Sequence, residues 1–150
     1  MERELPKVSI LIYLDDPTDD DPPRIQSALE RAAAARPWLT ESPEFVDVTE
    51  DAGATRPEDV PIRTVGVSLD VTDTRDRSMP LDLKRDGIEL QDFEALLAIV
   101  TDYSKEHSKT WTLLYDGCHV GSIENGVIDQ YVADGLLKPW RAVVNGTLRL

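Results

Sequence analysis

Hydrophobic residues follow two different spacings along this chain, and together they predict an α+β fold. From Thr64 to Val71 the apolar residues alternate with polar ones or glycine, which predicts a half-exposed strand of an antiparallel sheet. Further along, apolar residues fall three or four positions apart, which predicts one face of a helix that ends near His107. That face consists of Phe93, Leu96, Leu97 and Val100.

Two more elements are predicted before residue 40. The run from Val8 to Leu14 is rich in β-branched residues and bounded by turn formers, as expected of a buried strand. A helix is then expected to run to about Arg36, with Asp21 as its N-cap and Pro22 at its first position, where a missing N–H costs nothing. Its apolar stripe consists of Ile25, Ala28, Leu29 and Ala32.

The remaining strands are expected to form hairpins, apart from a short strand at 44–48. Residues 84–87 are expected to close one hairpin, and Asp116-Gly117 a second one between strands at 111–115 and 118–123. Asn125-Gly126 is expected to turn into a short helix that ends at Gly135. The apolar side of that short helix is Val127, Ile128, Tyr131 and Val132.

These elements predict a single acidic α+β domain spanning residues 1–150. Its 41% hydrophobic content is enough for an ordinary core without disulfides or a structural metal. The simplest assembly is a mainly antiparallel sheet with two main helices packed on one face. No segment has the length and apolar character of a membrane span, and the single cysteine favours a reducing compartment, so a soluble cytoplasmic protein is expected.

Charge narrows the possible partners. The chain holds 29 acidic and 16 basic side chains, a net charge of −13, and the excess is concentrated in the first 60 residues. A field of this sign repels nucleic acid, anionic lipid and nucleotides, and it attracts basic proteins. Acidic surfaces also serve solubility alone, which is the competing explanation.

The loop between the first strand and the first helix is the candidate site. It places five carboxylates in seven positions: Asp15, Asp16, Asp19, Asp20 and Asp21. Carboxylates at this density suit a hard cation, but in the calcium-loop pattern counted from Asp16 the required glycine is Asp21 and the closing glutamate is Ser27. The loop is therefore expected to be solvated or to bind a basic protein, and the choice between cation and protein stays open.

Cys118, His107 and His119 are the residue types that a thiol-dependent catalytic site needs. Neighbouring residues of a strand point to opposite faces, so Cys118 and His119 are not expected to form a catalytic pair. A buried structural cysteine and two ordinary histidines are expected instead. No catalytic residue, metal or cofactor is predicted.

Several short motifs resemble two-component receiver domains, in the order which that family has. They are Asp15-Asp16 after the first strand, Asp70 after Val67-Ser68-Leu69, Met79-Pro80, Asp86-Gly87 and Lys138-Pro139. The resemblance implies an α/β phospho-acceptor in which Asp15 and Asp16 bind Mg²⁺, Asp70 accepts phosphate and Lys138 contacts it. The spacing departs from the family, because Met79-Pro80 lies nine residues beyond Asp70.

The function expected from these observations is that of a non-enzymatic binding or inhibitor protein. It would act through an acidic surface at Asp15, Asp16, Asp19, Asp20 and Asp21 on a basic protein partner. A bacterial immunity protein that neutralises a toxin is the concrete form, by analogy of size, charge and class. A degenerate receiver-like domain is the alternative. Neither nucleic acid nor a membrane is an expected partner.

Overall fold

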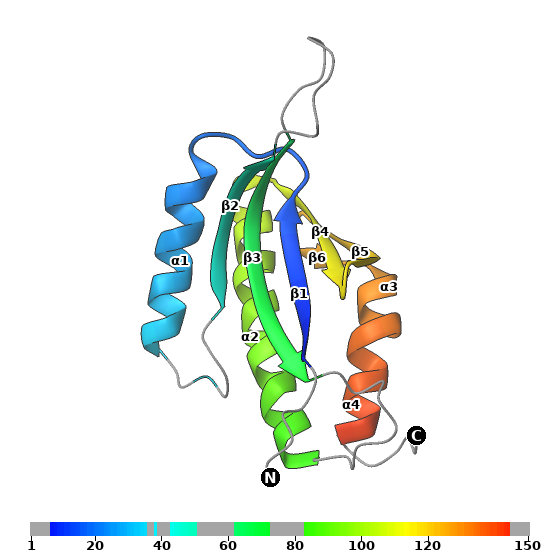
Figure 1. Cartoon of the computed structure of the whole chain (residues 1–150). Helices are drawn as coiled ribbons and strands as arrows, with labels where there is room; N and C mark the ends of the chain where they lie inside the picture. The colour runs from blue at the N-terminus through cyan, green and yellow to red at the C-terminus, as the bar shows by residue number, and fades with distance from the viewer. Residues whose placement is uncertain (1–6, 36–37, 39–42, 51–61, 73–82, 145–150) are drawn as a thin grey trace.

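Six strands form a single sheet in the order β2-β3-β1-β4-β5-β6, and every neighbouring pair is antiparallel (Figure 1). The computed structural model describes residues 7–35, 38, 43–50, 62–72 and 83–144. The strands are β1 (Lys7–Leu14), β2 (Glu44–Glu50), β3 (Ile62–Thr72), β4 (Thr110–Tyr115), β5 (Cys118–Glu124) and β6 (Val127–Ile128).

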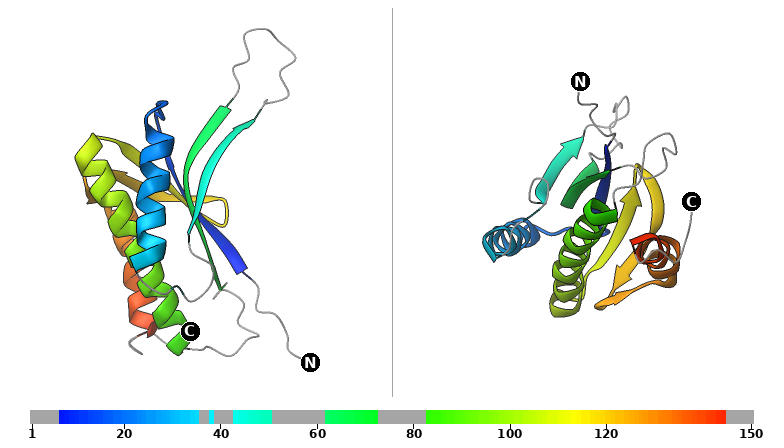
Figure 2. Two further views of the ribbon diagram at one scale, coloured as in Figure 1. Left: turned by 90° about the vertical axis from the view of Figure 1, so that its left-hand side faces the viewer. Right: turned by 90° about the horizontal axis from the view of Figure 1, so that it is seen from below.

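All the helices lie on one side of this sheet, as the edge-on view in Figure 2 shows. They are α1 (Asp21–Ala35), α2 (Leu83–His107), α3 (Gln130–Val132) and α4 (Lys138–Val144), with the π-helical turn η1 (Ala133–Leu137) joining the last two. The predicted α+β class, with two main helices on a mainly antiparallel sheet, is confirmed. None of the described helices is long and apolar enough to cross a membrane.

The order of the first four strands follows from two interleaved split β-α-β units. Helix α1 connects β1 to β2, α2 connects β3 to β4, and each connection leaves one strand between the two that it joins. This is the βαββαβ arrangement known as ferredoxin-like, to which β5, β6 and α3–α4 add an extension. The arrangement supports many unrelated functions, so the function has to be argued from the surface.

The strand register separates two faces of the sheet. On the face toward the helices, which we call the covered face, Ile12 pairs with Val67 and with Leu113, and all three are almost completely buried. Helix α2 packs its buried stripe against this layer: Leu90, Phe93, Leu96, Leu97, Val100 and Tyr103. Residues 93–100 of this stripe are those that the helical spacing predicts.

We call the opposite side the open face, because no described helix lies on it (Figure 2). The register places one alternating set of residues there. Those with described side chains are Ser9, Leu11, Tyr13, Glu44, Val46, Val48, Thr64, Ser68, Asp70, Thr110, Thr112, Leu114, His119, Ser122, Glu124 and Val127, together with Gly66. The side chains of Lys7, Glu50, Ile62 and Thr72, at the strand ends, are outside the described set.

The hairpin expected at residues 84–87 is wrong, because α2 already begins at Leu83. Leu90 lies three positions before Phe93 and is buried on the same stripe. Packing of that stripe against the sheet therefore extends the helix back through Asp86-Gly87, where local turn preference alone suggests a break.

The turn predicted at Asp116-Gly117 is confirmed, with positive φ angles of 51° and 77°. Asn125-Gly126 has the same pair of angles and closes a second hairpin onto β6, so the prediction that it enters a helix containing Val127 and Ile128 is wrong. The helix begins at Gln130, with Asp129 as its N-cap.

Gly135 does not end that helix, contrary to prediction. The N–H of Lys138 bonds the carbonyl of Ala133, five residues back, and the chain continues into α4 through Pro139. A wider turn at this point suits a proline, which has no N–H to donate and whose ring crowds the preceding turn of a regular helix. Trp140 lies in α4 and stacks on Phe93 with 5.5 Å between the ring centres.

Candidate functional site

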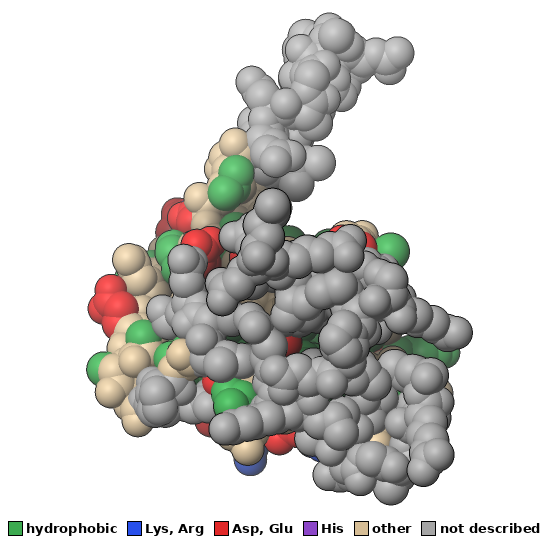
Figure 3. Space-filling model, turned by 60° about the horizontal axis from the view of Figure 1, so that its bottom comes forward, with side chains coloured by type: hydrophobic (Ala, Val, Ile, Leu, Met, Phe, Trp, Pro, Cys, Tyr) green, Lys and Arg blue, Asp and Glu red, His purple; other side chains and the backbone are tan. Residues whose placement is uncertain are grey.

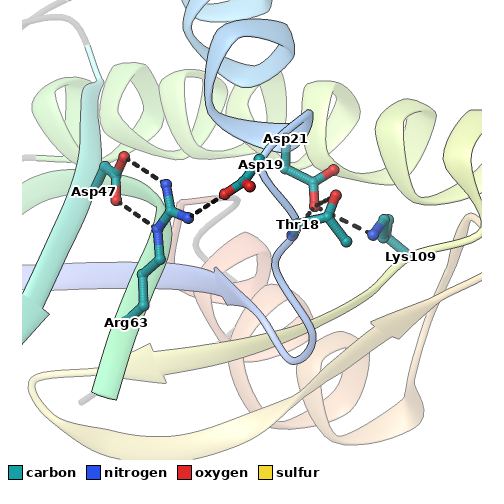
Figure 4. Close-up of polar contacts among 6 residues, drawn as sticks. All are labelled: Thr18, Asp19, Asp21, Asp47, Arg63 and Lys109. Carbon is teal, nitrogen blue, oxygen red and sulfur yellow. Dashed lines mark hydrogen bonds and ion pairs between the residues drawn. The ribbon is translucent and has the colours of Figure 1, made fainter. Parts of the chain in front are cut away.

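The five predicted site residues lie where β1 ends and α1 begins, at the upper end of the sheet in Figure 1. We call residues 15–20 the acidic loop. Figure 4 shows Asp19 of this loop bonded to Arg63 of β3, which also bonds Asp47 of β2. It also shows Asp21, the first residue of α1, in contact with Thr18 and Lys109. The five carboxylates fall into three groups. One is buried, one forms an ion pair at the surface, and three are exposed and form no ion pair with a described Lys or Arg side chain.

Asp21 is the buried one, with no exposed surface. Its carboxylate accepts hydrogen bonds from the Tyr103 hydroxyl at 2.5 Å and from the Thr18 backbone N–H at 2.8 Å, and it lies 3.2 Å from the Lys109 ammonium. Burial by itself raises the pKa of Asp21, but the donors from Tyr103, Thr18 and Lys109 outweigh it and the pKa is lowered. The carboxylate is therefore held ionised inside the protein.

Asp21 does not fit two of its predicted roles. Because it is buried and bonded internally, it is not available to a partner, and it leaves the set of candidate binding residues. It is the first residue of α1, and its carboxylate accepts bonds from the N–H and hydroxyl of Thr18, three residues earlier. This is the reverse of N-cap geometry, in which the side chain bonds N–H groups further along the helix.

Tyr103 is the residue that sequence reasoning missed most clearly. It is 6% exposed, and both burial and its bond to Asp21 raise its pKa. Its ring lies edge-on to Trp111, with 5.6 Å between centres, and near that of His107, at 4.4 Å. The helical spacing of the apolar stripe already includes position 103, but only the fold brings its hydroxyl to Asp21, 82 residues away.

Asp19 is paired at the surface. The guanidinium of Arg63 on β3 bonds Asp47 of β2 with two of its nitrogens and Asp19 with another, each at 3.1 Å (Figure 4). The bonds to Asp47 and then to Asp19 raise the pKa of Arg63. Exposed pairs of this kind contribute little to stability, but a planar guanidinium between two carboxylates fixes their direction.

Asp15, Asp16 and Asp20 are exposed like Asp19, but no described Lys or Arg forms an ion pair with their carboxylates. The Thr112 hydroxyl of β4 donates to the Asp15 carboxylate at 2.5 Å, which ties the loop to the open face. The Lys109 ammonium reaches the backbone carbonyl of Asp16 at 3.4 Å, rather than its carboxylate. Together with Asp21 and Arg63, these bonds hold the loop in one preformed shape.

The described residues around this site assemble neither a metal-binding group nor a cysteine–histidine pair. No group of three or more His, Cys, Asp or Glu side chains in the described part has the geometry to hold a metal ion. Cys118 is exposed at the β4–β5 hairpin, so the expectation of a buried cysteine is wrong. His107 lies beyond the other end of β4, at the end of α2, so the fold does not bring it to Cys118.

The receiver resemblance fails on both of its structural requirements. A receiver has a parallel central sheet, whereas every pair of strands here is antiparallel. Asp70 pairs with Ser9 near the start of β1, while Asp15 and Asp16 follow its end, which separates them by about 20 Å along the strand. Lys138 is exposed and lies in α4, on the helix side of the sheet.

Acidic side chains are not confined to the acidic loop. Seen from below (Figure 3), Asp and Glu appear at separate places over the described surface, with Lys and Arg only at the lower rim. An open groove of about 1270 Å³ also runs between α1 and α2, and charges of both signs line it: Arg24, Glu30, Arg31, Asp102 and Glu106.

Fold and site together define an α+β protein with a preformed acidic loop and no assembled catalytic centre among the described residues. No protein-family model, curated protein or solved structure matches the chain.

Proposed function

We propose that this protein is a non-enzymatic inhibitor that binds a basic protein through its acidic loop, in the manner of an immunity protein that neutralises a bacterial toxin in the cytoplasm. The observation that carries the proposal is the preformed loop: Asp15, Asp16 and Asp20 are exposed, while their backbone is fixed by the internal bonds of Asp21. A loop that is already ordered loses little conformational entropy when it binds.

The net charge of −13 supports the same proposal through the rate of association. Opposite charges on two proteins raise the association rate constant, and screening by salt removes this gain. Two basic side chains of this chain, Arg63 and Lys109, compensate the negative charges of Asp19 and Asp21. The other three carboxylates, those of Asp15, Asp16 and Asp20, are left to act on a partner.

Co-expression tests the proposed function. The proteins encoded by the genes on either side of this one are expressed alone and with this chain, and growth is measured. We expect one basic product to arrest growth alone, and this chain to relieve the arrest. If no flanking product is toxic, or if a toxic one is not relieved, the immunity role is wrong.

The acidic loop is tested on the same pair by neutralising its exposed residues. We expect Asp16→Asn with Asp20→Asn to lower the association rate constant about tenfold at low ionic strength. The matched control neutralises two exposed acids of α2, with Asp102→Asn and Glu106→Gln, and removes the same total charge. Equal effects of the two pairs would show that only net charge matters and would remove the loop from the mechanism.

A further inference from the structure

The open face differs from the helix layer in the sign of its charges. Each charged residue of this face that has a described side chain is acidic, namely Glu44, Asp70 and Glu124. Lys7 at the start of β1 also belongs to this face by register, but its side chain is outside the described set. The helices expose both signs, with bases at Arg24, Arg31, Lys105, Lys138 and Arg141 and acids at Glu30, Asp102, Glu106 and Asp134.

The centre of the open face is apolar. Leu11 lies opposite Leu114 in the register and is half-buried, like Leu114 itself. Tyr13 lies opposite Gly66, which in turn lies opposite Val46. A Cβ atom at Gly66 would collide with the carbonyl oxygen of Ile12, so glycine is required at this position, which has no side chain of its own between Tyr13 and Val46.

The acids surround this centre. Glu44 lies at one end of the row Glu44–Ser68–Leu11–Leu114–His119, which crosses five strands. Asp70 lies at the lower end of β3 and Glu124 at the upper end of β5, while Asp15 joins the upper rim through its bond from Thr112. An apolar centre within a charged rim is the usual composition of a protein–protein interface.

We infer that the open face and the acidic loop form one docking surface for a protein whose matching surface has an apolar centre ringed by Lys and Arg. The inference rests on the proposed function, since the partner is the same basic protein, and it adds where that partner sits. Five strands at about 4.8 Å spacing and seven residues along β3 give roughly 400 Å², about half of what one partner contributes to a standard interface. The loop supplies part of the remainder.

A second copy of this chain does not fit the surface. Its own open face carries the same acids, and each chain has a net charge of −13, so two such faces repel each other. A basic partner would form attractive ion pairs with the same residues. Because these acids would stay exposed at the rim of the interface, they would lose little hydration on pairing.

The test compares two pairs of substitutions that change the net charge equally, one pair on the open face and the other on the helices. The probe is a synthetic ten-residue peptide of alternating leucine and lysine, which presents one apolar and one basic side when extended, and binding is measured by fluorescence anisotropy. We expect Glu44→Lys with Asp70→Lys to raise Kd at least about tenfold. Glu30→Lys with Asp102→Lys, in the groove between α1 and α2, makes the same change in net charge and is expected to raise it by less than about threefold.

Tyrosine substitutions test the apolar centre separately. Tyr13→Ser is expected to weaken binding of the leucine–lysine peptide, whereas Tyr131→Ser, on α3 with 66% exposure, is expected to leave it unchanged. A peptide of alternating leucine and glutamate is expected not to bind. Tyr13→Ser also removes packing and can lower the stability of the fold. The Glu44→Lys, Asp70→Lys variant changes only exposed side chains and therefore tests the surface in a folded protein.

Four results would overturn the inference. They are equal losses from the two lysine pairs, losses confined to Asp16→Lys with Asp20→Lys, no binding of the leucine–lysine peptide to the unchanged protein, and a dimer of this chain that Tyr13→Ser dissociates. None of them decides the proposed function, because relief of growth arrest by co-expression does not depend on which surface is used.

Discussion

The two faces of the sheet are built from neighbouring residues of the same strands, yet they differ in what their side chains do. In β1, Ile12 is fully buried beneath the helices, while Leu11 and Tyr13 on either side of it are half-exposed. The buried residues of the covered face are apolar and hold the fold together, although Asp47 and Arg63 also belong to this face by register. The open face mixes apolar, small polar and acidic residues, which is typical of a solvent-exposed surface rather than of a core. Alternation along a strand thus places residues that stabilise the fold next to residues that remain at the surface.

The largest difference between the two faces is expected when neighbouring side chains on opposite faces are truncated. We expect Ile12→Ala to lower the free energy of unfolding by about 3 kcal/mol, because it leaves a cavity in the covered face. Leu11→Ala is expected to cost about 1 kcal/mol or less, because that side chain is already half in water. Urea denaturation of both variants measures the difference. Similar losses would mean that the open face is also part of the core.

The next largest effect is expected at the bond that anchors the acidic loop. Tyr103→Phe removes the hydroxyl that donates to the buried Asp21 carboxylate and is expected to cost about 2 kcal/mol at neutral pH. Asp102→Asn, on the exposed side of the same helix, is expected to change stability by less than about 0.5 kcal/mol. Losses of equal size would remove the anchor from the account.

The same bond sets a dependence on pH. Because the pKa of Asp21 is lowered in the folded state, its contribution is fully present above the unfolded-state pKa of about 3.9 and is lost as the pH falls through the folded value. The difference in stability between the unchanged protein and Tyr103→Phe is therefore expected to be constant from about pH 7 to 5 and to shrink below about pH 4. A difference that grows toward low pH would contradict the ionised state of Asp21.

A smaller effect is expected from salt on binding. Raising the ionic strength from about 0.01 M to 0.15 M shortens the range of charge interactions from about 30 Å to 8 Å and should slow association with the basic partner. The dissociation rate constant is expected to change much less, because rim charges act mainly on encounter. Stopped-flow measurements separate the two rates. An association rate that is independent of salt would contradict an acidic docking surface.

The smallest effect is expected at the surface pairs of Arg63. Arg63→Gln removes both pairs, but these lie in water, where exposed ion pairs contribute little, and we expect no resolvable change in the denaturation midpoint. The change should appear instead in the loop, as faster amide hydrogen exchange at Asp19 and Asp20. Unchanged exchange there would show that Arg63 does not order the acidic loop.

Much of the fold could be predicted because its elements carry local patterns. Alternation gave β3, helical spacing gave the buried stripe of α2, and Asp116-Gly117 gave a hairpin with its left-handed turn. The errors arise where tertiary packing overrides local preference. Helix α2 continues back to Leu83 through a glycine, and the last helix passes Gly135 by widening to a π turn. Neither the extension of α2 nor the π turn can be read from the few residues around it, because both depend on packing against distant parts of the chain.

The candidate site was predictable as a cluster of acids but not as a set of roles. Five carboxylates in seven residues are visible in the sequence, whereas the burial of Asp21 depends on Tyr103 and Lys109, more than 80 residues later. The pairing of Asp19 likewise depends on Arg63, and the bond of Asp15 on Thr112. Only long-range packing decides which acids of one loop are structural and which are exposed.

Carboxylate footprinting tests the docking surface most directly. Asp and Glu side chains are labelled with a water-soluble carbodiimide and an amine, without and with the bound leucine–lysine peptide, and the label at each residue is measured by mass spectrometry. We expect protection at six residues of the loop and the open face: Asp15, Asp16, Asp20, Glu44, Asp70 and Glu124. Labelling of Glu30, Asp102, Glu106 and Asp134 in the helix layer should not change. Protection in the helix layer, with the open face labelled as in the free protein, would contradict the account.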